Sequence, residues 1–450
     1  MQIPRRRVAQ VWAAIAMIAL VCASVLMPPI RFSDNFPYVR AEQLLLATVF
    51  VGYAWFALAG YARKIHCNGM FVIGSLYAFC VALSTWYGAD MLHHQVIFRD
   101  FYEIPKVLFP VLFFTVAYEA ELQEESLRML LKCFGVATFL VCVYAWSQFD
   151  GLAFTYRLNG FYSGGEHIDL LLTNVGRVYS TMANPNVLGQ LMSWCLVAFT
   201  MAALAGVGSR IWNIVLAFAC LVTLAMTASR YGLITASLGI LLIFAFPSRS
   251  GRQRSAQLVL LLLLLPVFAL TFRAVATVNR SGIQRIQTLQ DPLHTDSLQG
   301  RLDVRWVDAA KDIARSPWIG NGSAKEFFGD IITDSEYLDM LKQFGIVGFS
   351  VYLAYYIFPL YLLGKGLTAT RRVNSSIEER LPATLLTLRL SFVMIILALA
   401  MSIGESTFTN LLLQGFLWMW MGLGARSART LRDVSRRVVA PAPARRVLAV

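Results

Sequence analysis

Charged side chains suited to binding an anion gather in one long polar stretch of this 450-residue chain, residues 301–349. The stretch reads RLDVRWVDAAKDIARSPWIGNGSAKEFFGDIITDSEYLDMLKQFGIVGF and is interrupted by glycine and proline. Apolar residues recur at helical spacing from 300 to 316, which predicts a helix. Arg301 and Arg305 lie four residues apart on one face of that helix. The pattern therefore predicts two neighbouring guanidinium groups, an arrangement suited to an anionic substrate.

Two acidic residues introduce the next predicted helix, which begins with DSEYL. Asp334 has the residue type and place of an N-cap, whose carboxylate accepts hydrogen bonds from free backbone N–H groups. Glu336 then falls in the first turn, where the helix dipole favours negative charge. Gly345 and Gly348, further along, are predicted to be close-packing sites between helices. On spacing alone, the favoured interpretation of Asp334 is a helix cap.

Two further arginines are candidate anion contacts outside this stretch. Arg230 lies in TASRYG, which separates two apolar runs with almost no loop. An arginine this close to the hydrocarbon boundary is costly to leave unpaired. It either extends to a lipid phosphate or binds a substrate phosphate with its bidentate fork. The small neighbours Ser229 and Gly232 would let a ligand approach closely, which favours the substrate. Arg177 lies in an earlier polar loop, where a solvated loop charge is an equal alternative.

Composition and hydropathy place these residues in a membrane protein. Hydrophobic residues make up 57% of the chain, charged residues only 14%, and the mean hydropathy is +0.60. We predict an all-α polytopic membrane protein with a single membrane domain, residues 1–424. A spanning helix needs about 20 mostly apolar residues. About twelve spans of that kind are predicted, near 11–29, 43–61, 70–88, 104–118, 128–148, 187–206, 211–228, 231–246, 258–275, 344–363, 383–402 and 406–423.

Lysine and arginine indicate the orientation of the spans, because they collect on cytoplasmic loops. The rule is satisfied when both termini are cytoplasmic, and the net charge of +13 then requires no nucleic acid as partner. Two long loops, 149–186 and 276–343, face outward, the larger one between spans nine and ten. Its arginines run against the topological preference, which favours an anionic substrate. The basic tail, 425–450, contains PAPA and is predicted to be disordered.

Other kinds of site find little support in the sequence. Five scattered histidines show no metal-ligand spacing, and the seven cysteines form neither a disulfide framework nor a CxxC motif. Asp330, Asp334 and Glu336 offer oxygen ligands for a divalent ion, but we predict no metal site. Neither a Walker nor a Rossmann fingerprint occurs. No cofactor is therefore predicted.

The order of four motifs resembles the bacterial O-antigen ligase and polymerase family. ANPN opens one span, TASRYG joins two spans, RLDVRW…SPWIGNG lies in the large outer loop, and DSEYLDMLKQFGIVGF enters the next span. The resemblance covers residues 175–350 and the twelve-span plan. It implies a membrane-embedded, lipid-linked glycosyltransferase of the bacterial inner membrane, with its active site on the periplasmic face and no obligatory metal. The implied partners are an undecaprenyl-pyrophosphate-linked glycan donor, a hydroxyl acceptor carried in the same way, and membrane lipid; a chain-length regulator is a candidate partner.

The resemblance also implies roles for individual residues. Arg230 and Arg301 would hold the donor pyrophosphate, and we add Arg305 and Arg177 as predicted contacts. Ligases of the family usually carry histidine at the start of the helix after the loop, whereas this chain has Asp334, which favours a polymerase over a ligase. The mechanism we predict uses Asp334, or failing that Glu336, as the base or as the group that orients the acceptor hydroxyl.

Two alternatives remain at this point. The first is a ligase that transfers finished polymer to a terminal acceptor. The second is a transporter or flippase of the same lipid-linked sugar, a class in which internal repeats and charges at the bilayer midplane are common. We find no clear repeat, and charge at span centres is scarce, so an enzyme is favoured.

Overall fold

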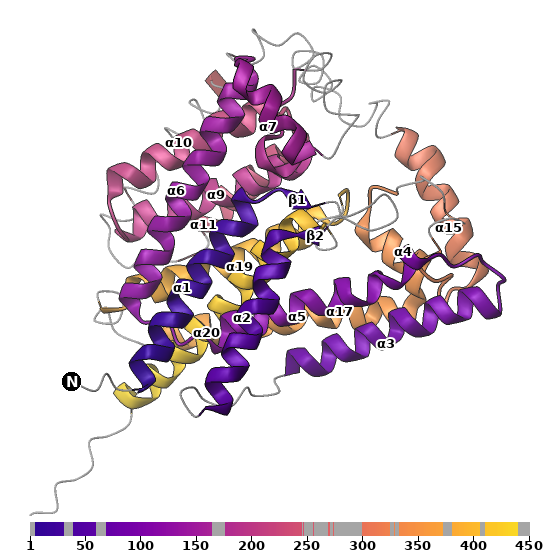
Figure 1. Cartoon of the computed structure of the whole chain (residues 1–450), viewed down its shortest axis with the longest axis horizontal. Coiled ribbons are helices and arrows are strands. Elements are labelled where there is room, and N and C mark those ends of the chain that lie inside the picture. Colours follow the sequence, from indigo (N-terminus) through magenta and orange to yellow (C-terminus); the bar gives the residue numbers. More distant parts are fainter. Residues whose placement is uncertain are drawn as a thin grey trace, which may run out of the picture.

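The computed structural model is a bundle of helices with one short two-stranded hairpin (Figure 1). It describes residues 5–30, 39–59, 69–163, 176–244, 299–324, 333–371, 380–405 and 410–439, with a few isolated positions between them. The described elements, in chain order, are α1 (Arg5–Leu26), β1 (Pro29–Ile30), β2 (Val39–Arg40), α2 (Ala41–Leu58), α3 (Gly69–Asp90), α4 (Phe98–Phe101), α5 (Glu103–Glu119), α6 (Glu124–Phe149), α7 (Ala153–Ser163), η1 (Ser180–Met182), α9 (Pro185–Ala205), α10 (Arg210–Thr227), α11 (Arg230–Phe244), η2 (Arg301–Arg305), α15 (Trp306–Arg315), α17 (Glu336–Arg371), α19 (Pro382–Met401) and α20 (Leu411–Val439).

Seven of the described helices are long and apolar enough to cross a membrane, namely α1, α3, α6, α9, α10, α17 and α19. The apolar helix α11 is shorter, and α2, α5 and α20 coincide with three more predicted spans. The predicted ninth span, 258–275, lies outside the described residues except for isolated positions. The all-α polytopic class is therefore confirmed, while the number of twelve spans stays a prediction.

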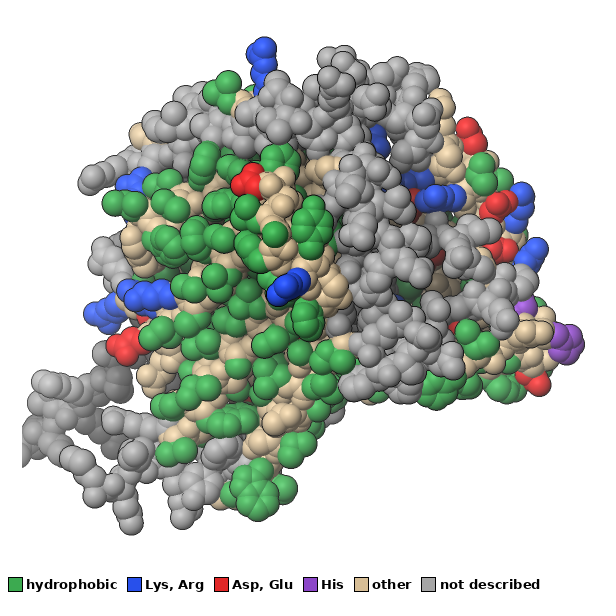
Figure 2. Space-filling view, turned by 45° about the horizontal axis from the view of Figure 1, so that its top comes forward, with side chains coloured by type: hydrophobic (Ala, Val, Ile, Leu, Met, Phe, Trp, Pro, Cys, Tyr) green, Lys and Arg blue, Asp and Glu red, His purple; other side chains and the backbone are tan. Residues whose placement is uncertain are grey.

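Apolar side chains cover much of the outer surface (Figure 2). Helix α3 shows the pattern most simply, because exposed residues recur along it every three or four positions. They are Val72, Leu76, Phe79, Leu83 and Trp86, each between 37% and 63% exposed. A continuous apolar stripe of this length would be an association surface in water. In a polytopic protein it is the surface that lipid chains cover.

Helix α9 forms the centre of one half of the bundle and is packed by α10, α11 and α19. Its side chains also contact those of α6. Its side chains are almost all buried. Gly189 allows the closest approach, because a Cβ there would lie 2.6 Å from the Cβ of Ser229. Gly232 packs on the same point, and a Cβ there would lie 3.0 Å from the backbone of Gly189. These small residues therefore bring α9 and α11 together, and our interpretation that Ser229 and Gly232 leave room for a ligand is wrong.

Helix α17 is broken at Gly345, where φ is 62° and ψ is −172°. The loop after α15 fills the break: the N–H groups of Asn321 and Gly322 donate to the carbonyls of Lys342 and Gln343, at 3.1 and 2.9 Å. A Cβ at Gly345 would lie 2.4 Å from the carbonyl oxygen of Trp318. The expected close packing is therefore present, but against a loop and in a left-handed conformation that glycine tolerates. The break fixes α15 against α17.

Helix α20 continues through Val439, so the prediction of disorder from residue 425 is wrong as far as that residue. Ala425, Ala428 and Leu431 recur at helical spacing and are buried, which gives the basic segment an apolar face. Arg426 lies within 2.9 Å of Glu121. The basic composition concealed this amphipathic pattern. Residues 440–450 lie outside the described part of the chain.

Candidate functional site

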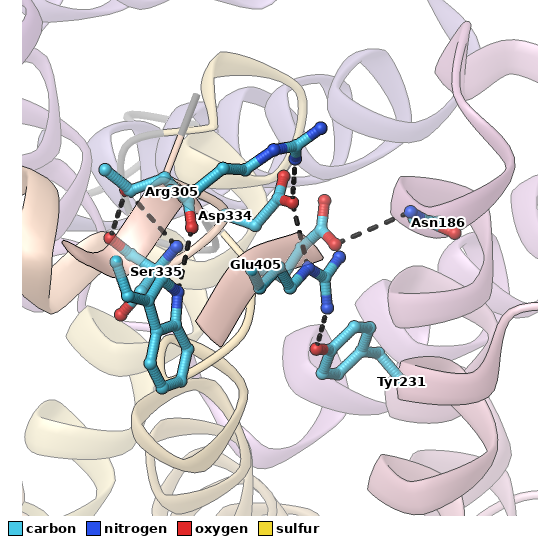
Figure 3. Close-up of polar contacts among 9 residues, drawn as sticks. Asn186, Tyr231, Arg305, Asp334, Ser335 and Glu405 are labelled. Atoms are coloured by element: carbon cyan, nitrogen blue, oxygen red, sulfur yellow. Dashed lines mark hydrogen bonds and ion pairs between the residues drawn. The ribbon is translucent and has the colours of Figure 1, made fainter. Parts of the chain in front are cut away.

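Segments far apart in the sequence meet at one end of the bundle, where the termini of four apolar helices lie together (Figure 3). Helices α9, α11 and α17 begin there, and α19 ends there. These ends supply Asn186, Tyr231, Asp334 and Glu405, and η2 adds Arg301. The site is thus assembled by the fold from residues that span more than 200 positions of the chain.

Asp334 binds two guanidinium groups through the same oxygen. The Nε of Arg301 donates to Oδ2 at 2.9 Å, and the Nη1 of Arg305 also donates to Oδ2. Arg301 and Asp334 are largely buried, with side chains 13% and 20% exposed, whereas Arg305 is 47% exposed. The prediction that the two arginines share a face is confirmed, because both reach one carboxylate. The cluster carries a net positive charge and opens to solvent on the side of Arg305.

The backbone explains why Asp334 points toward these arginines. Its φ is 59°, a left-handed conformation that aspartate adopts more readily than most residues. Helix α17 begins at Glu336, and the carbonyl of Ser335 accepts the first helical hydrogen bond, from the N–H of Asp339 at 3.0 Å. Ser335 thus occupies the N-cap position. The interpretation of Asp334 as the cap is wrong, because the turn before α17 directs its carboxylate to η2.

The start of α15 is held against the same turn. The Nε1 of Trp306 donates to the carbonyl of Thr333 at 3.1 Å. Thr333 in turn donates its hydroxyl to the carbonyl of Ser335 at 3.0 Å. These bonds tie the start of α15 to the turn before α17, so they hold the arginine pair in place relative to Asp334.

Glu336 is fully buried and holds α17 to the end of α19. Its N–H donates to the carbonyl of Ser402 at 3.0 Å, and its Oε2 accepts from the hydroxyl of Ser402 at 3.1 Å. A carboxylate that is closed off from solvent and hydrogen-bonded in this way is a structural support. Glu336 lies two residues from Asp334, but its side chain is closed to solvent whereas that of Asp334 is partly exposed.

Tyr231 supports Arg301 from the opposite side. Its hydroxyl oxygen accepts a hydrogen bond from Nη1 of Arg301, and the guanidinium carbon lies 5.3 Å from the centre of its ring. Gly404 makes this placement possible, because a Cβ there would lie 2.4 Å from the tyrosine oxygen. Arg301 is therefore held in one orientation by Asp334 and Tyr231 together, with only two of its donor positions used in these two bonds.

Glu405, in the turn after α19, lies beside this cluster. Its Oε2 lies 3.5 Å from the Nδ2 of Asn186, and Figure 3 shows it between Asp334 and Asn186. Burial raises the pKa of Glu405 from 4.5 to about 7, and the negative charge of Asp334 acts in the same direction. The charges of Arg301 and Arg177 and the hydrogen bond from Asn186 oppose that rise. Glu405 is thus a partly buried carboxylate that titrates close to neutral pH.

From the sequence alone, Glu405 could be placed at an outer turn but not assigned to the site. The available signal was a carboxylate that follows an apolar span within a few residues, in MSIGES. A residue in that place serves equally well to face lipid headgroups. Only the approach of α9 and α17 to the end of α19 separates the two interpretations.

The other two predicted pyrophosphate contacts occupy different places. Arg177 is 6% exposed; its Nε donates to the carbonyl of Thr227 at 2.8 Å and its Nη2 to Oδ1 of Asn186 at 2.7 Å. It joins the site through Asn186, and both of these bonds are to partners within the protein. Arg230 is half-buried and is the first residue of α11, directly before Tyr231.

Sharp left-handed turns precede three of the helices that form the site. Such conformations cost energy for residues other than glycine and cluster at functional sites. Within the described residues, five non-glycine positions adopt them. Four of the five precede α9, α11 or α17: Ser180, Ala183, Ala228 and Asp334. The surrounding fold therefore maintains strained turns at this end of the bundle. Among the described residues, no group of three or more His, Cys, Asp or Glu side chains is arranged to hold a metal ion.

Residues 215–353 match the family model described as O-antigen ligase. The match confirms the predicted resemblance to the O-antigen ligase and polymerase family. It runs from within α10 to within α17 and includes Arg230, Arg301 and Asp334. The matched family has a role in the assembly of O-antigen and related polysaccharides. The apolar helices and the family match together indicate a multi-pass membrane protein. A search of curated proteins finds no match.

Proposed function

We propose that this protein is a membrane-embedded glycosyltransferase that joins undecaprenyl-pyrophosphate-linked repeat units into a polysaccharide at the periplasmic face of the inner membrane. The observation that carries the proposal is the cluster of Arg301, Arg305 and Asp334 at the ends of apolar helices. The cluster lies within the segment that matches the O-antigen ligase model. A positive cluster at the edge of a membrane domain is suited to a ligand with a diphosphate headgroup and a lipid tail.

The arginines bind the donor. Transfer breaks the bond between the anomeric carbon and the phosphate oxygen, so negative charge grows on the leaving pyrophosphate. Guanidinium groups that are already oriented stabilise that charge without reorganising. Arg301 is oriented by Asp334 and Tyr231, and the exposed Arg305 presents its remaining donors to solvent. Arg230, at the start of α11, extends the same surface in our proposal.

The carboxylates divide the remaining tasks. Asp334 holds the two guanidinium groups and orients the acceptor hydroxyl, since it is exposed enough to be reached. Glu336 supports the turn from behind through Ser402. Arg177 positions Asn186, and through it Glu405. The burial of Arg177 favours this positioning role over direct contact with the pyrophosphate.

Topology supports the periplasmic assignment. The charge distribution predicts that spans six, eight and ten begin on the outer side and that span eleven ends there. These spans correspond to α9, α11, α17 and α19. The helix ends that form the site are the same four, so the fold brings together ends that the charge rule places on one side of the membrane.

A ligase that transfers finished polymer to a terminal acceptor is the second candidate, because the family model matched is that of O-antigen ligase. Asp334, in the place where ligases usually carry histidine, is the feature that favours polymerisation. Analysis of lipid-linked glycans in cells that lack the protein separates the two. Loss of a polymerase leaves single repeat units on the lipid, whereas loss of a ligase leaves long lipid-linked polymer. A transporter or flippase would instead leave repeat units on the cytoplasmic side, inaccessible to a periplasmic glycosidase.

A further inference from the structure

Three carboxylates lie around the arginine cluster, and two of them already have other tasks. The Oδ2 of Asp334 accepts hydrogen bonds from both Arg301 and Arg305, so the lone pairs of that oxygen are engaged by cations. Glu336 is fully buried and is hydrogen-bonded to Ser402. Neither arrangement suits a group that must take a proton from an incoming hydroxyl and release it again.

Glu405 is the third carboxylate, and its surroundings differ. The only direct side-chain partner found for it in the described residues is Asn186, at 3.5 Å. It is placed by the turn after α19, where its N–H donates to the carbonyl of Met401 at 3.1 Å. It is partly exposed, and Figure 3 shows it beside the arginine-bound face of Asp334. The carboxylate is thus fixed in position while its oxygens are only weakly occupied.

We propose that Glu405 is the general base of the transfer reaction, an inference that rests on the proposed function. The acceptor hydroxyl gives its proton to an oxygen of Glu405, and the electron pair of the O–H bond forms the new bond to the anomeric carbon of the donor. The bond between that carbon and the pyrophosphate oxygen breaks, and its electron pair leaves with undecaprenyl pyrophosphate. The protonated Glu405 then releases its proton to water.

The electrostatic surroundings support this role. A general base works best when its pKa is near the working pH, and burial together with Asp334 raises the pKa of Glu405 to about 7. Opposite charge on Arg301 and Arg177 acts against that rise, as does the hydrogen bond from Asn186. Bound pyrophosphate would neutralise the arginines and remove part of this opposition. The base would then become stronger when the donor is bound.

The first test uses purified protein in liposomes with lipid-linked repeat units extracted from cells that lack it. Glu405→Gln keeps the shape of the side chain and removes the base. We expect the rate of transfer to fall about 10²- to 10⁴-fold, while the affinity for the lipid-linked donor changes less than about threefold. Glu125→Gln is the matched control, because Glu125 is exposed at the start of α6, remote from the site. Its rate should equal that of the wild type.

The second test is the dependence of the rate on pH, which a merely structural role would not change. The wild-type rate should rise through pH 7 as Glu405 loses its proton. Removal of the hydrogen bond in Asn186→Ala should move this rise to higher pH, because that bond lowers the pKa of Glu405. Glu405→Gln should show no rise near pH 7.

The outcomes distinguish this inference from the proposed function. If wild-type protein makes no glycosidic bond, the proposed function is wrong. If the wild type is active and Glu405→Gln retains its full rate or its rise near pH 7, the assignment of the base is wrong while the proposed function stands.

Discussion

Helix α19 has a carboxylate at each of its ends, and the two carboxylates are held in opposite ways. At the first turn, Glu124 of α6 accepts hydrogen bonds from the N–H groups of Ala383 and Thr384, at 2.6 and 3.0 Å, and from the hydroxyl of Thr384 at 2.9 Å. This is the end of a helix where negative charge is favourable. Beyond the last turn, Glu405 meets the end where negative charge is unfavourable, and Asp334 adds to the cost.

The comparison separates charge used for structure from charge kept for chemistry. Glu124 satisfies backbone donors that would otherwise be free, and nearby Glu121 pairs with Arg426. These groups hold α6, α19 and α20 together. Glu121 and Glu124 are therefore structural links between helices and not solvated charges. At the opposite end, Arg301 and Arg305 both bind Asp334 beside Glu405, and Arg305 stays exposed. Substitutions should affect stability at the first end and activity at the second.

Among substitutions within the arginine cluster, the largest effect is expected for Arg301→Lys. Lysine has no planar fork, so its single nitrogen cannot reach Asp334 and Tyr231 on opposite sides and still direct a pair of donors at the pyrophosphate. We expect kcat/KM to fall about 10²- to 10³-fold, the size of effect seen when one oriented donor to a developing anion is removed. The measurement is the transfer rate in liposomes, with thermal unfolding as the check on folding. Lys311→Arg, an exposed change in α15, is the control. An unchanged rate in Arg301→Lys would remove Arg301 from the site.

Asp334→Asn should follow. Asparagine keeps the shape and the tolerance of a left-handed φ, but it loses the charge that holds the two guanidinium groups. We expect the transfer rate to fall about 10- to 100-fold, because misplaced catalytic groups have effects of that order. Polymer length in cells and the rate in liposomes measure it. Asp308→Asn, in α15 and exposed, should have no effect. Full-length polymer from Asp334→Asn at normal expression would contradict the assigned role.

Glu405→Gln should stabilise the protein at alkaline pH. The pKa of Glu405 is about 7 when folded, against 4.5 as its ordinary value. Below pH 4.5 the group is protonated in both states, and between pH 4.5 and 7 the unfolded chain binds fewer protons, so stability falls as the pH rises. Glutamine avoids that loss. Allowing for its partial exposure, we expect a gain of about 1–3 kcal/mol at pH 8.

The measurement is the apparent unfolding temperature in detergent across this pH range. Variant and wild type should agree near pH 4.5 and diverge as the pH rises. A wild type that is more stable than Glu405→Gln at pH 8 would mean that the ionised carboxylate is favourable in the fold, like Glu124. The contrast between the two ends of α19 would then disappear.

Glu124→Ala should show the smallest effect and the opposite sign. It leaves two N–H groups at the start of α19 without their acceptor, so we expect a loss of about 1 kcal/mol in stability. The transfer rate should remain that of the wild type. Glu125→Ala, at the adjacent exposed position, controls for the loss of charge. A large drop in activity for Glu124→Ala without a drop in stability would show that this end also takes part in function.

Much of the fold could be predicted because apolar length and charge placement act locally. Helices such as α6, α9 and α19 end within a few residues of the predicted spans. The motifs that meet at the site could also be located, because Arg301 and Arg305 share a face at helical spacing. What the sequence did not indicate was the left-handed turn at Asp334, since capping is the commoner use of an aspartate before a helix.

Long-range contacts account for the other differences. The break at Gly345 is maintained by a loop that hydrogen-bonds across it, and no periodicity within α17 reveals it. The place of Glu405 in the site depends on its contact with Asn186, which lies more than 200 residues earlier in the chain. The amphipathic face of α20 was not recognised in the sequence, because it consists largely of alanines among many arginines and these indicate a buried face only weakly.

The most direct test of the central claim is a product assay with purified protein in liposomes that contain lipid-linked repeat units and nothing else that forms glycosidic bonds. Wild-type protein is predicted to convert single repeat units into a ladder of lipid-linked chains, and Arg301→Lys is predicted to leave them as single units. Absence of the ladder with folded wild-type protein, or an equal ladder with Arg301→Lys, would contradict the claim that this arginine cluster carries out glycan transfer.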